Sequence, residues 1–272
     1  MGDSASVFTA PGGSLSWVVL PESKAVVDPG DQPELESILH SGQLQQIYTM
    51  GRRSVYRGFL PGGREIAVKE VCYRGLVRQF KMRHLREPKV LHEFRSGCEY
   101  LSKGGKTPRF LGMVVEQNAL VLKRGFIFLE WLDNAVTLTE YLKSQDCYVS
   151  DGFWRDLANS LVVSAQTGLV HGGHSPENVM VVSGEDEPVF RFQIIDFADS
   201  KLHDAFHAEG FASDISRIGA RMVTEDACEK EQVIGFLHAI VEAAWPDQSS
   251  RSTWFEIIKS GVDAILSGEK KM

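Results

Sequence analysis

Short runs of alternating or continuous apolar residues follow one another through the first half of the chain, and they predict a set of β-strands. Between the third and the fourth of these runs, apolar residues recur at helical spacing, which predicts one helix from about Arg83 to Lys103. The first half is therefore expected to be a sheet with one embedded helix. The expected strands are Ile47–Met50, Val55–Leu60, Glu65–Val71, Phe110–Val115, Ala119–Lys123 and Phe126–Trp131.

After Asn134 the pattern changes, and most apolar positions follow the repeat of helices. A β-rich half followed by a helical half predicts a two-lobed α+β protein. We expect an N-terminal extension at residues 1–42, a first lobe with a hinge at 43–132 and a second lobe at 133–272. The expected helices are Leu138–Gln145, Gly152–Thr167, Ser213–Val223, Lys230–Ala244 and Trp254–Leu266, with a hairpin of Val179–Val182 and Phe190–Ile195.

Composition narrows the classes of function. Of the 272 residues, 43% are hydrophobic and 24% are charged, as in ordinary globular proteins, and the net charge of −7 argues against binding to nucleic acid. The four cysteines have the spacing of neither a zinc site nor a disulfide framework, which indicates a reducing compartment. No apolar run reaches the roughly 18 residues of a transmembrane helix. The expected location is the cytoplasm.

One segment departs from this acidic average. Six cations but a single acid, Glu87, lie in the stretch that begins at Arg74 and ends at Lys89. This basic segment is typical either of a solvated helix or of a surface that binds an anion. In the second case we expect a charged acceptor or a membrane surface rather than the nucleotide. The cations are Arg74, Arg78, Lys81, Arg83, Arg86 and Lys89.

Lys69 ends the apolar run that begins at Ile66. Removal of an ammonium group from water costs several kcal/mol unless an anion meets it, so burial of Lys69 would require an anionic partner. Glu93, in the helix that follows, is a candidate for this partner and would aim the lysine at a phosphate. The alternatives are a lysine that reaches water at the strand edge and a solvated helix glutamate.

A second group of chemically active residues follows in the second half. The segment from Val170 to Met180 joins a long helix to a strand and is rich in turn-forming and hydrogen-bonding residues. Asp196 ends the next buried strand. In one hairpin, Asn178 and Asp196 would lie at the same edge, where an amide oxygen and a carboxylate suit Mg²⁺ held together with substrate phosphates.

These residues occur in an order that resembles the signature of the protein-kinase-like fold: Lys69, Glu93, the run His171–Asn178, and Asp196 followed by Phe197. Within that superfamily the chain is similar to the bacterial lipopolysaccharide core kinases, which phosphorylate Kdo or heptose sugars. The resemblance implies that the protein binds ATP and Mg²⁺. The segments that carry the closer resemblance are Tyr73–Arg78, His92–Arg95 and His171–Gly172.

The resemblance also implies a role for each matching residue. Lys69 would hold the α- and β-phosphates, with Glu93 as its ion-pair partner, and Asn178 and Asp196 would bind Mg²⁺. Four further residues have implied roles: Gly51 in the loop that covers the phosphates, Glu130 and Leu132 in the hinge that contacts adenine, and Asp214 as the buried aspartate that supports the catalytic loop.

Departures from the family pattern concern catalysis. Gly173 stands where the catalytic-base aspartate is expected, and Ala198 replaces the glycine of the Asp-Phe-Gly motif. The loop after Met50 has lost most of the family's glycines, so fewer backbone N–H groups would approach the phosphates. Asp214 follows Asp196 too closely for a long activation segment, which argues against a protein substrate.

Two functional hypotheses follow. The first is a kinase of low activity for a lipopolysaccharide core sugar, an anionic glycolipid or a similar acceptor, at the inner face of the inner membrane. Loss of a general base typically slows a reaction about 10²–10⁴-fold. In this hypothesis His174 or Glu177 replaces the missing base, and His174 is preferred because it is adjacent to Gly173 and titrates near neutral pH. The second is a pseudokinase, a nucleotide-binding or scaffolding module that lacks the base at Gly173.

Overall fold

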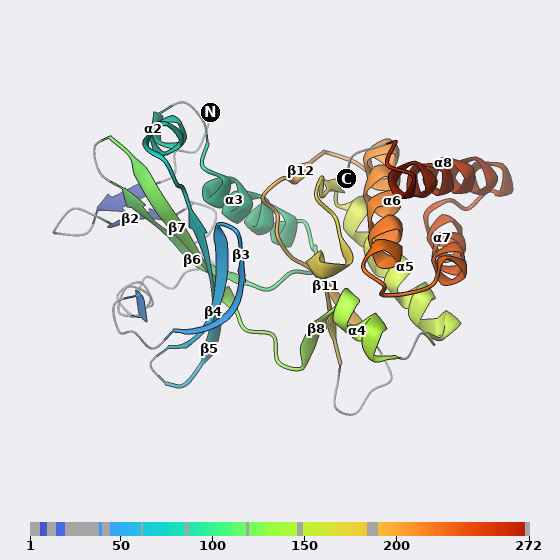
Figure 1. Cartoon of the computed structure of the whole chain (residues 1–272), viewed down its shortest axis with the longest axis horizontal. Helices are drawn as coiled ribbons and strands as arrows, with labels where there is room; N and C mark the ends of the chain where they lie inside the picture. The colour runs from blue at the N-terminus through green and yellow to red at the C-terminus, as the bar shows by residue number, and fades with distance from the viewer. Residues whose placement is uncertain are drawn as a thin grey trace. The chain divides into compact units, whose positions relative to one another are not determined.

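The chain divides into two compact units in the computed structural model (Figure 1). Unit 1 comprises Met1–Cys98 and Pro108–Trp131, and unit 2 comprises Glu99–Thr107 and Leu132–Met272. The lobe boundaries expected from the sequence stay predictions. Most of residues 1–42 and Arg86 of the basic segment lie outside the described residues, which are 6–9, 15–19, 38–39, 44–60, 62–84, 87–117, 120–145, 149–183 and 190–269.

Within the described part of unit 1, seven strands form one antiparallel sheet in the order β1-β2-β6-β7-β5-β4-β3. Two of the strands, β1 and β2, come from the expected N-terminal extension, and β2 pairs with β6. β5 is an interior strand of this sheet and pairs with β4 on one side and β7 on the other. The strands are β1 Ser6–Thr9, β2 Leu15–Val19, β3 Gln45–Met50, β4 Arg53–Phe59, β5 Glu65–Cys72, β6 Phe110–Gln117 and β7 Leu122–Glu130.

Strand β7 corrects the expectation of two separate strands at Ala119–Lys123 and Phe126–Trp131. It is continuous from Leu122 to Glu130 and includes Gly125, which the sequence pattern suggested as part of a break. Glycine is needed there because a Cβ on Gly125 would lie 2.6 Å from Cγ1 of Val90 in the neighbouring helix. The residue therefore marks a close approach between helix and sheet.

The helices between β5 and β6 also differ from the expectation of one helix at Arg83–Lys103. The structure has two helices, α2 Leu76–His84 and α3 Lys89–Ser102. Pro88 precedes α3, and its carbonyl oxygen accepts hydrogen bonds from the N–H groups of Leu91 and His92. A proline cannot continue a helix from the preceding residue, so the second helix begins after it.

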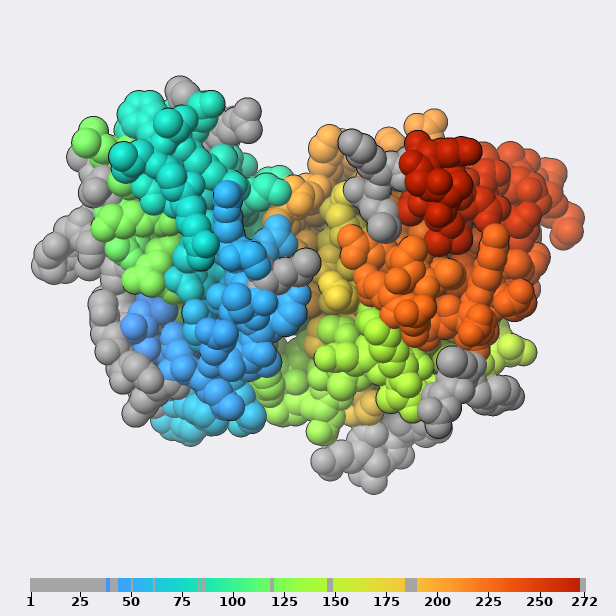
Figure 2. Space-filling model, in the orientation of Figure 1, coloured from blue at the N-terminus to red at the C-terminus, as the bar shows by residue number. Residues whose placement is uncertain are grey.

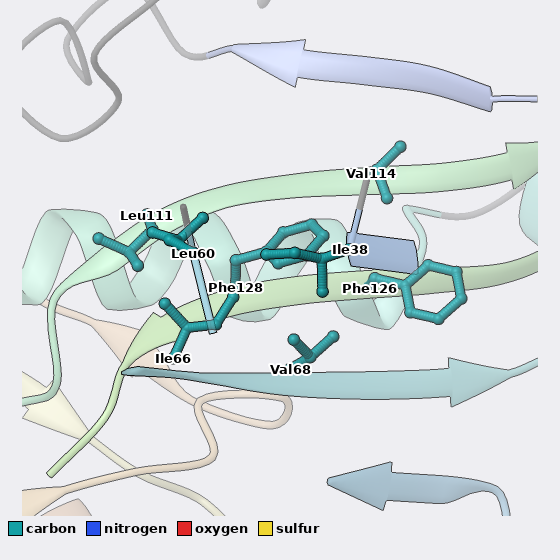
Figure 3. Packing of buried hydrophobic residues seen from close by; sticks show 8 residues of the cluster. All are labelled: Ile38, Leu60, Ile66, Val68, Leu111, Val114, Phe126 and Phe128. Carbon is teal, nitrogen blue, oxygen red and sulfur yellow. The ribbon is translucent and has the colours of Figure 1, made fainter. Parts of the chain in front are cut away.

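One hydrophobic cluster packs on the central strands of unit 1 (Figure 3). Side chains from β5, β6 and β7 meet there with Ile38 and Leu60, and Phe128 of β7 is fully buried. Burial of such side chains stabilises the fold by about 1.5–3 kcal/mol each. The cluster therefore fixes β5 and β7, the strands that carry candidate site residues. Its members are Ile38, Leu60, Ile66, Val68, Leu111, Val114, Phe126 and Phe128.

Unit 2 is mainly helical. Its long helix α5 begins after Ser150, whose side chain accepts a hydrogen bond from the N–H of Phe153. Two helices begin earlier than expected, α6 at Ala208 rather than Ser213 and α8 at Gln248 rather than Trp254, because His207 and Asp247 cap them. The helices are α4 Leu138–Ser144, α5 Asp151–Gln166, α6 Ala208–Thr224, α7 Lys230–Ala244 and α8 Gln248–Leu266.

Short strands connect the helices of unit 2. The expected hairpin forms from β10 Val179–Val182 and β11 Arg191–Ile194, and β8 Ala135–Thr137 pairs with β10. β9 Leu169–Val170 pairs with β12 Lys201–Leu202. A sheet-containing part followed by a mainly helical part confirms the expected α+β class.

Candidate functional site

Lys69 lies in the middle of the sheet of unit 1. In strand β5, Lys69 pairs with Val55 of β4 on one side and with Ile127 of β7 on the other. Only 8% of its surface is exposed, and its cross-strand neighbour Ile127 is fully buried. An ammonium group at this depth is unstable without an anionic partner.

Glu93 of α3 supplies that partner. It is 3% exposed, and its Oε1 accepts a hydrogen bond from Nζ of Lys69 at 2.5 Å. A pair this deeply buried contributes little net stability, because desolvation of the two charges offsets their attraction. Stability alone therefore does not account for the pair, and its clearest effect is to orient the ammonium group.

Two glycines let α3 lie against the sheet and so set the position of Glu93. Gly125 of β7 faces Val90 of α3, and a Cβ on Gly97 of α3 would overlap the ring of Phe110 in β6. Neither contact leaves room for a larger residue. The pairing of Lys69 with Glu93 thus depends on close packing at both ends of this helix segment.

Three other predicted residues lie at the ends of elements. Gly51 opens the two-residue turn between β3 and β4 with a φ of +61°, which glycine adopts readily. Glu130 ends β7, and its N–H donates to the carbonyl oxygen of Arg109 at 2.9 Å. Leu132 is half-buried. Their predicted roles in nucleotide binding stay predictions.

In unit 2, the hairpin of β10 and β11 brings Asn178 and Asp196 to the same end. The N–H of Ile195 donates to the carbonyl oxygen of Asn178 at 2.9 Å. Nδ2 of Asn178 donates to the carbonyl oxygen of Gly173, also at 2.9 Å, which leaves the amide oxygen as the atom of this side chain that could bind a metal ion. An amide oxygen beside a carboxylate fits Mg²⁺, which completes its coordination with phosphates and water.

Asp196 has an unusual backbone conformation. Its φ is +64°, in the left-handed region that few residues other than glycine adopt, at a cost of about 1–3 kcal/mol. The next residue, Phe197, is fully buried, with its ring centroid 5.3 Å from that of Tyr100 and 5.9 Å from that of His171. The buried ring helps to hold Asp196 in this conformation, which is typical of functional sites.

Helix α6 holds the loop that begins at His171. Oδ2 of Asp214 accepts a hydrogen bond from the N–H of His171 at 2.6 Å, and Oδ1 accepts one from Gly172 at 3.0 Å. Arg217 donates to the carbonyl oxygen of Gly172. Nε2 of His171 lies 2.9 Å from the carbonyl oxygen of Ile195. These contacts join α6, the loop and the end of β11 in one network.

His174, the predicted substitute base, is buried. It is 7% exposed, and its ring stacks on that of His171 with centroids 4.3 Å apart. Burial, with the neighbouring His171 as a smaller cause, lowers the pKa of His174 well below its usual value. The ring is therefore neutral at pH 7, but the lowered pKa makes it a weak base, and a substrate reaches it only if the loop moves. Its catalytic role stays a prediction.

Position 173 contrasts with its neighbour. Gly172 has a φ of +73°, and a Cβ there would collide with the carbonyl oxygen of Asp199. Gly173 is exposed, has no left-handed φ, and has no heavy atom within 4 Å of where a Cβ would lie. The loop thus requires glycine at 172 but has room for a side chain at 173.

The structure of WaaP in complex with acyl carrier protein is similar to this chain. Its TM-score is 0.57 at 15% sequence identity, over 89% of this chain and 96% of that chain. The chain has a protein-kinase-like fold. The Rio2 kinase of Chaetomium thermophilum, in an ADP/Mg²⁺–phosphoaspartate complex, aligns with a TM-score of 0.46 at 17% identity, over 85% of this chain and 75% of that chain.

At 15% sequence identity, the similarity to WaaP shows the fold alone. No protein-family model and no curated protein sequence matches this kinase-like chain. Among the described residues, no group of three or more His, Cys, Asp and Glu residues that could hold a metal ion occurs. No helix in the described ranges is long and apolar enough to cross a bilayer.

The kinase-like fold contains supporting residues that the sequence analysis missed. Arg217 braces the loop through Gly172, and the hydroxyl group of Tyr100 donates to Oγ of Ser164 at 2.7 Å while its ring contacts Phe197. The position of Arg217, one helical turn after Asp214, was the available signal. No local pattern marks Tyr100, because its contacts are distant in sequence.

The buried carboxyl group of Asp214 predicts a dependence of stability on pH. Burial raises its pKa to about 6, although hydrogen bonds from His171 and Gly172 lower it. The folded state then binds the proton more tightly than the unfolded state, so the free energy of unfolding is highest below the unfolded pKa and falls as the pH rises from about 4 to about 6. We expect a loss on the order of 2–3 kcal/mol across this window.

Urea unfolding of the natural chain and of Asp214→Asn at each pH measures this loss. The substitution removes the titrating group, so the difference in unfolding free energy between the two chains should change across the window. Since an amide cannot accept from both N–H groups equally well, a constant offset is also expected. A difference that stays constant from pH 4 to pH 6 contradicts the raised pKa.

Proposed function

We propose that this protein binds Mg-ATP and transfers the γ-phosphoryl group to a hydroxyl group of an anionic sugar, such as a core sugar of lipopolysaccharide. The observation that carries the proposal is the buried ion pair of Lys69 and Glu93. An ammonium group oriented by a helix glutamate is the arrangement by which kinases hold the α- and β-phosphates. The fold and the buried pair together favour nucleotide binding over a purely structural role.

The proposal assigns the metal to unit 2. Asn178 and Asp196 are the Mg²⁺ ligands, and the metal when bound neutralises charge on the phosphates. Gly51, Glu130 and Leu132 complete the nucleotide site, as the family resemblance implies. Phosphoryl transfer depends mainly on positioning and charge neutralisation, so these residues can support a rate without a strong base.

The acceptor hydroxyl group must lose a proton during transfer. In the family pattern an aspartate receives it, but this chain has Gly173. The proposal assigns the proton to His174, which is neutral at pH 7 because burial lowers its pKa. This role requires motion of the loop, since the ring is buried. The proposed kinase is therefore slow.

Gly173 favours a second candidate, a pseudokinase. The residue is exposed and makes no contact that would need glycine, so nothing in the packing explains the loss of the aspartate. A protein that only binds nucleotide or acts as a scaffold does not need the base. The two candidates share the nucleotide site and differ in turnover.

Mg-ATP should stabilise the natural chain against thermal unfolding, because a ligand at 100 times its Kd adds about 2.7 kcal/mol. Asp196→Asn should weaken the shift with Mg-ATP more than the shift with ATP alone, since it removes a charged metal ligand. A chain that shows no shift with saturating Mg-ATP refutes the kinase and the nucleotide-binding pseudokinase, and leaves only a scaffold that binds no nucleotide. Turnover with core oligosaccharide as acceptor then separates them, because only the kinase forms ADP and a phosphorylated sugar.

A further inference from the structure

Helix α2 exposes apolar side chains where a soluble protein usually presents polar ones. Leu76 is 75% exposed, Val77 71% and Phe80 46%, and Leu120, in the turn between β6 and β7, is 67% exposed. Their spacing places the three helix residues on one face. The apolar side of a surface helix normally faces the core, whereas this side of α2 faces solvent.

Polar contacts fix the helix in this orientation. Nε2 of Gln79 donates to the carbonyl oxygen of Tyr73 at 2.6 Å, and Nε2 of His84 lies 3.2 Å from the carbonyl oxygen of Leu120. Figure 1 shows α2 at one end of the sheet of unit 1, and Figure 2 shows its teal residues at the surface of this unit. The exposed apolar face is therefore a property of the folded unit.

Cations surround this face. Arg74, Arg78 and Lys81 have no carboxylate partner among the residues that the structure describes. Glu87, the acid of the segment, is already engaged, because its Oε1 accepts a hydrogen bond from Arg95 at 2.6 Å. We call the apolar residues Leu76, Val77, Phe80 and Leu120, together with the cations Arg74, Arg78 and Lys81, the α2 patch.

The surface beside α2 is hollowed. An open depression of about 710 Å³ lies there, and the surface that lines it is mostly apolar. Its lining residues include the apolar Leu76, Val77 and Met82 and the cationic Arg78, Lys81 and Lys89.

We propose that the α2 patch docks this protein on a bilayer that contains anionic phospholipids. Such a bilayer offers phosphate groups and hydrocarbon side by side, at depths that match cations flanking exposed Leu, Val and Phe side chains. An acidic protein would match the cations, but it would have to place apolar surface among its carboxylates to cover Leu76 and Val77. An anionic bilayer therefore matches both the exposed apolar residues and the cations of the α2 patch.

The proposal goes beyond nucleotide binding and is tested separately from it. The full chain is mixed with vesicles of phosphatidylcholine alone or of phosphatidylcholine with phosphatidylglycerol, and the bound fraction is measured by sedimentation. We expect binding to the anionic vesicles only, and weaker binding at high salt, because salt screens the attraction. The Mg-ATP thermal shift serves as the control for folding and should be unchanged in every variant.

Two double variants divide the patch into its parts. Arg74→Gln with Lys81→Gln should reduce the partition onto anionic vesicles about fivefold for each cation removed. Leu76→Ser with Val77→Ser should also reduce the partition onto anionic vesicles. The part of the binding that this variant loses should depend less on salt concentration. The matched controls lie in unit 2: Lys143→Gln with Arg155→Gln for charge, and Val163→Ser with Ile257→Ser for exposed apolar residues. Neither control should alter binding.

A direct measurement of contact comes from Leu76→Trp, with Ile257→Trp as its control. Brominated lipids in anionic vesicles should quench the added fluorescence at position 76 but not at 257. The proposal is overturned if the natural chain does not bind anionic vesicles, or if both patch variants bind as well as the natural chain. It is also overturned, in favour of a protein partner, if an acidic protein such as acyl carrier protein binds the patch and vesicles do not.

Discussion

Gly173→Asp should raise the rate of phosphoryl transfer by about 10²–10⁴-fold if the natural chain is a slow kinase, because it restores a general base beside the acceptor. The substitution is structurally accessible, since position 173 is exposed, has no left-handed φ and has no heavy atom within 4 Å of a new Cβ. Formation of phosphorylated core oligosaccharide from ATP is the measurement. Stability and Mg-ATP affinity should remain close to those of the natural chain.

Gly173→Asn is the matched control, because the amide has the size of the carboxylate but cannot accept the proton. Only the aspartate should accelerate turnover. His174→Ala in the natural chain tests the substitute base, and an unchanged rate would remove His174 from the mechanism. If neither the natural chain nor Gly173→Asp transfers phosphate while both bind Mg-ATP, the chain is a pseudokinase.

Lys69→Met should lower the free energy of unfolding by about 3–5 kcal/mol, because it leaves the carboxylate of Glu93 buried without its charged partner. The double variant, Lys69→Met with Glu93→Leu, should recover most of this stability, since apolar residues of similar size replace a buried ion pair with little net loss. Neither variant should bind Mg-ATP. Urea unfolding measures the stability, and calorimetric titration measures the nucleotide binding.

Together the two variants separate the effect of Lys69 on the free energy of unfolding from its effect on Mg-ATP binding. Loss of ATP binding in a double variant that is as stable as the natural chain assigns the lysine to the nucleotide site. The exposed pair of Lys103 and Glu99 is the control, and its removal should change stability by less than about 1 kcal/mol. A double variant that still binds Mg-ATP with natural affinity would exclude the assigned role of Lys69.

Sequence reasoning predicted the elements whose pattern is local. Strand β5 and helix α5 have clear apolar patterns and defined ends, and the structure contains both close to their expected bounds. The residues made the pairing of Lys69 with Glu93 one of two alternatives, beside a solvated lysine and glutamate, and the family resemblance implied it. The apolar pattern of a single segment determines each of the two elements, and the pair follows from one electrostatic requirement, that a buried cation has an anionic partner.

The features that sequence reasoning missed depend on distant contacts. Strands β8, β9 and β12 have two or three residues each, too few for a recognisable pattern, and they exist through pairing with remote segments. Gly125 was predicted to lie in a break between two strands, because its close contact with Val90 of α3 has no signal in the local sequence. The φ of Asp196 and the exposed apolar face of α2 have no local signal, because both are imposed by tertiary packing.

The contrast between Gly172 and Gly173 has an evolutionary consequence. The fold constrains Gly172 through its backbone and through Asp214 and Arg217, whereas no heavy atom lies within 4 Å of where a Cβ on residue 173 would be placed. Under selection for the fold alone, position 172 should stay glycine in diverging lineages while position 173 drifts freely. The same open position can accept an acidic side chain in a single mutational step without disturbing the packing of the loop.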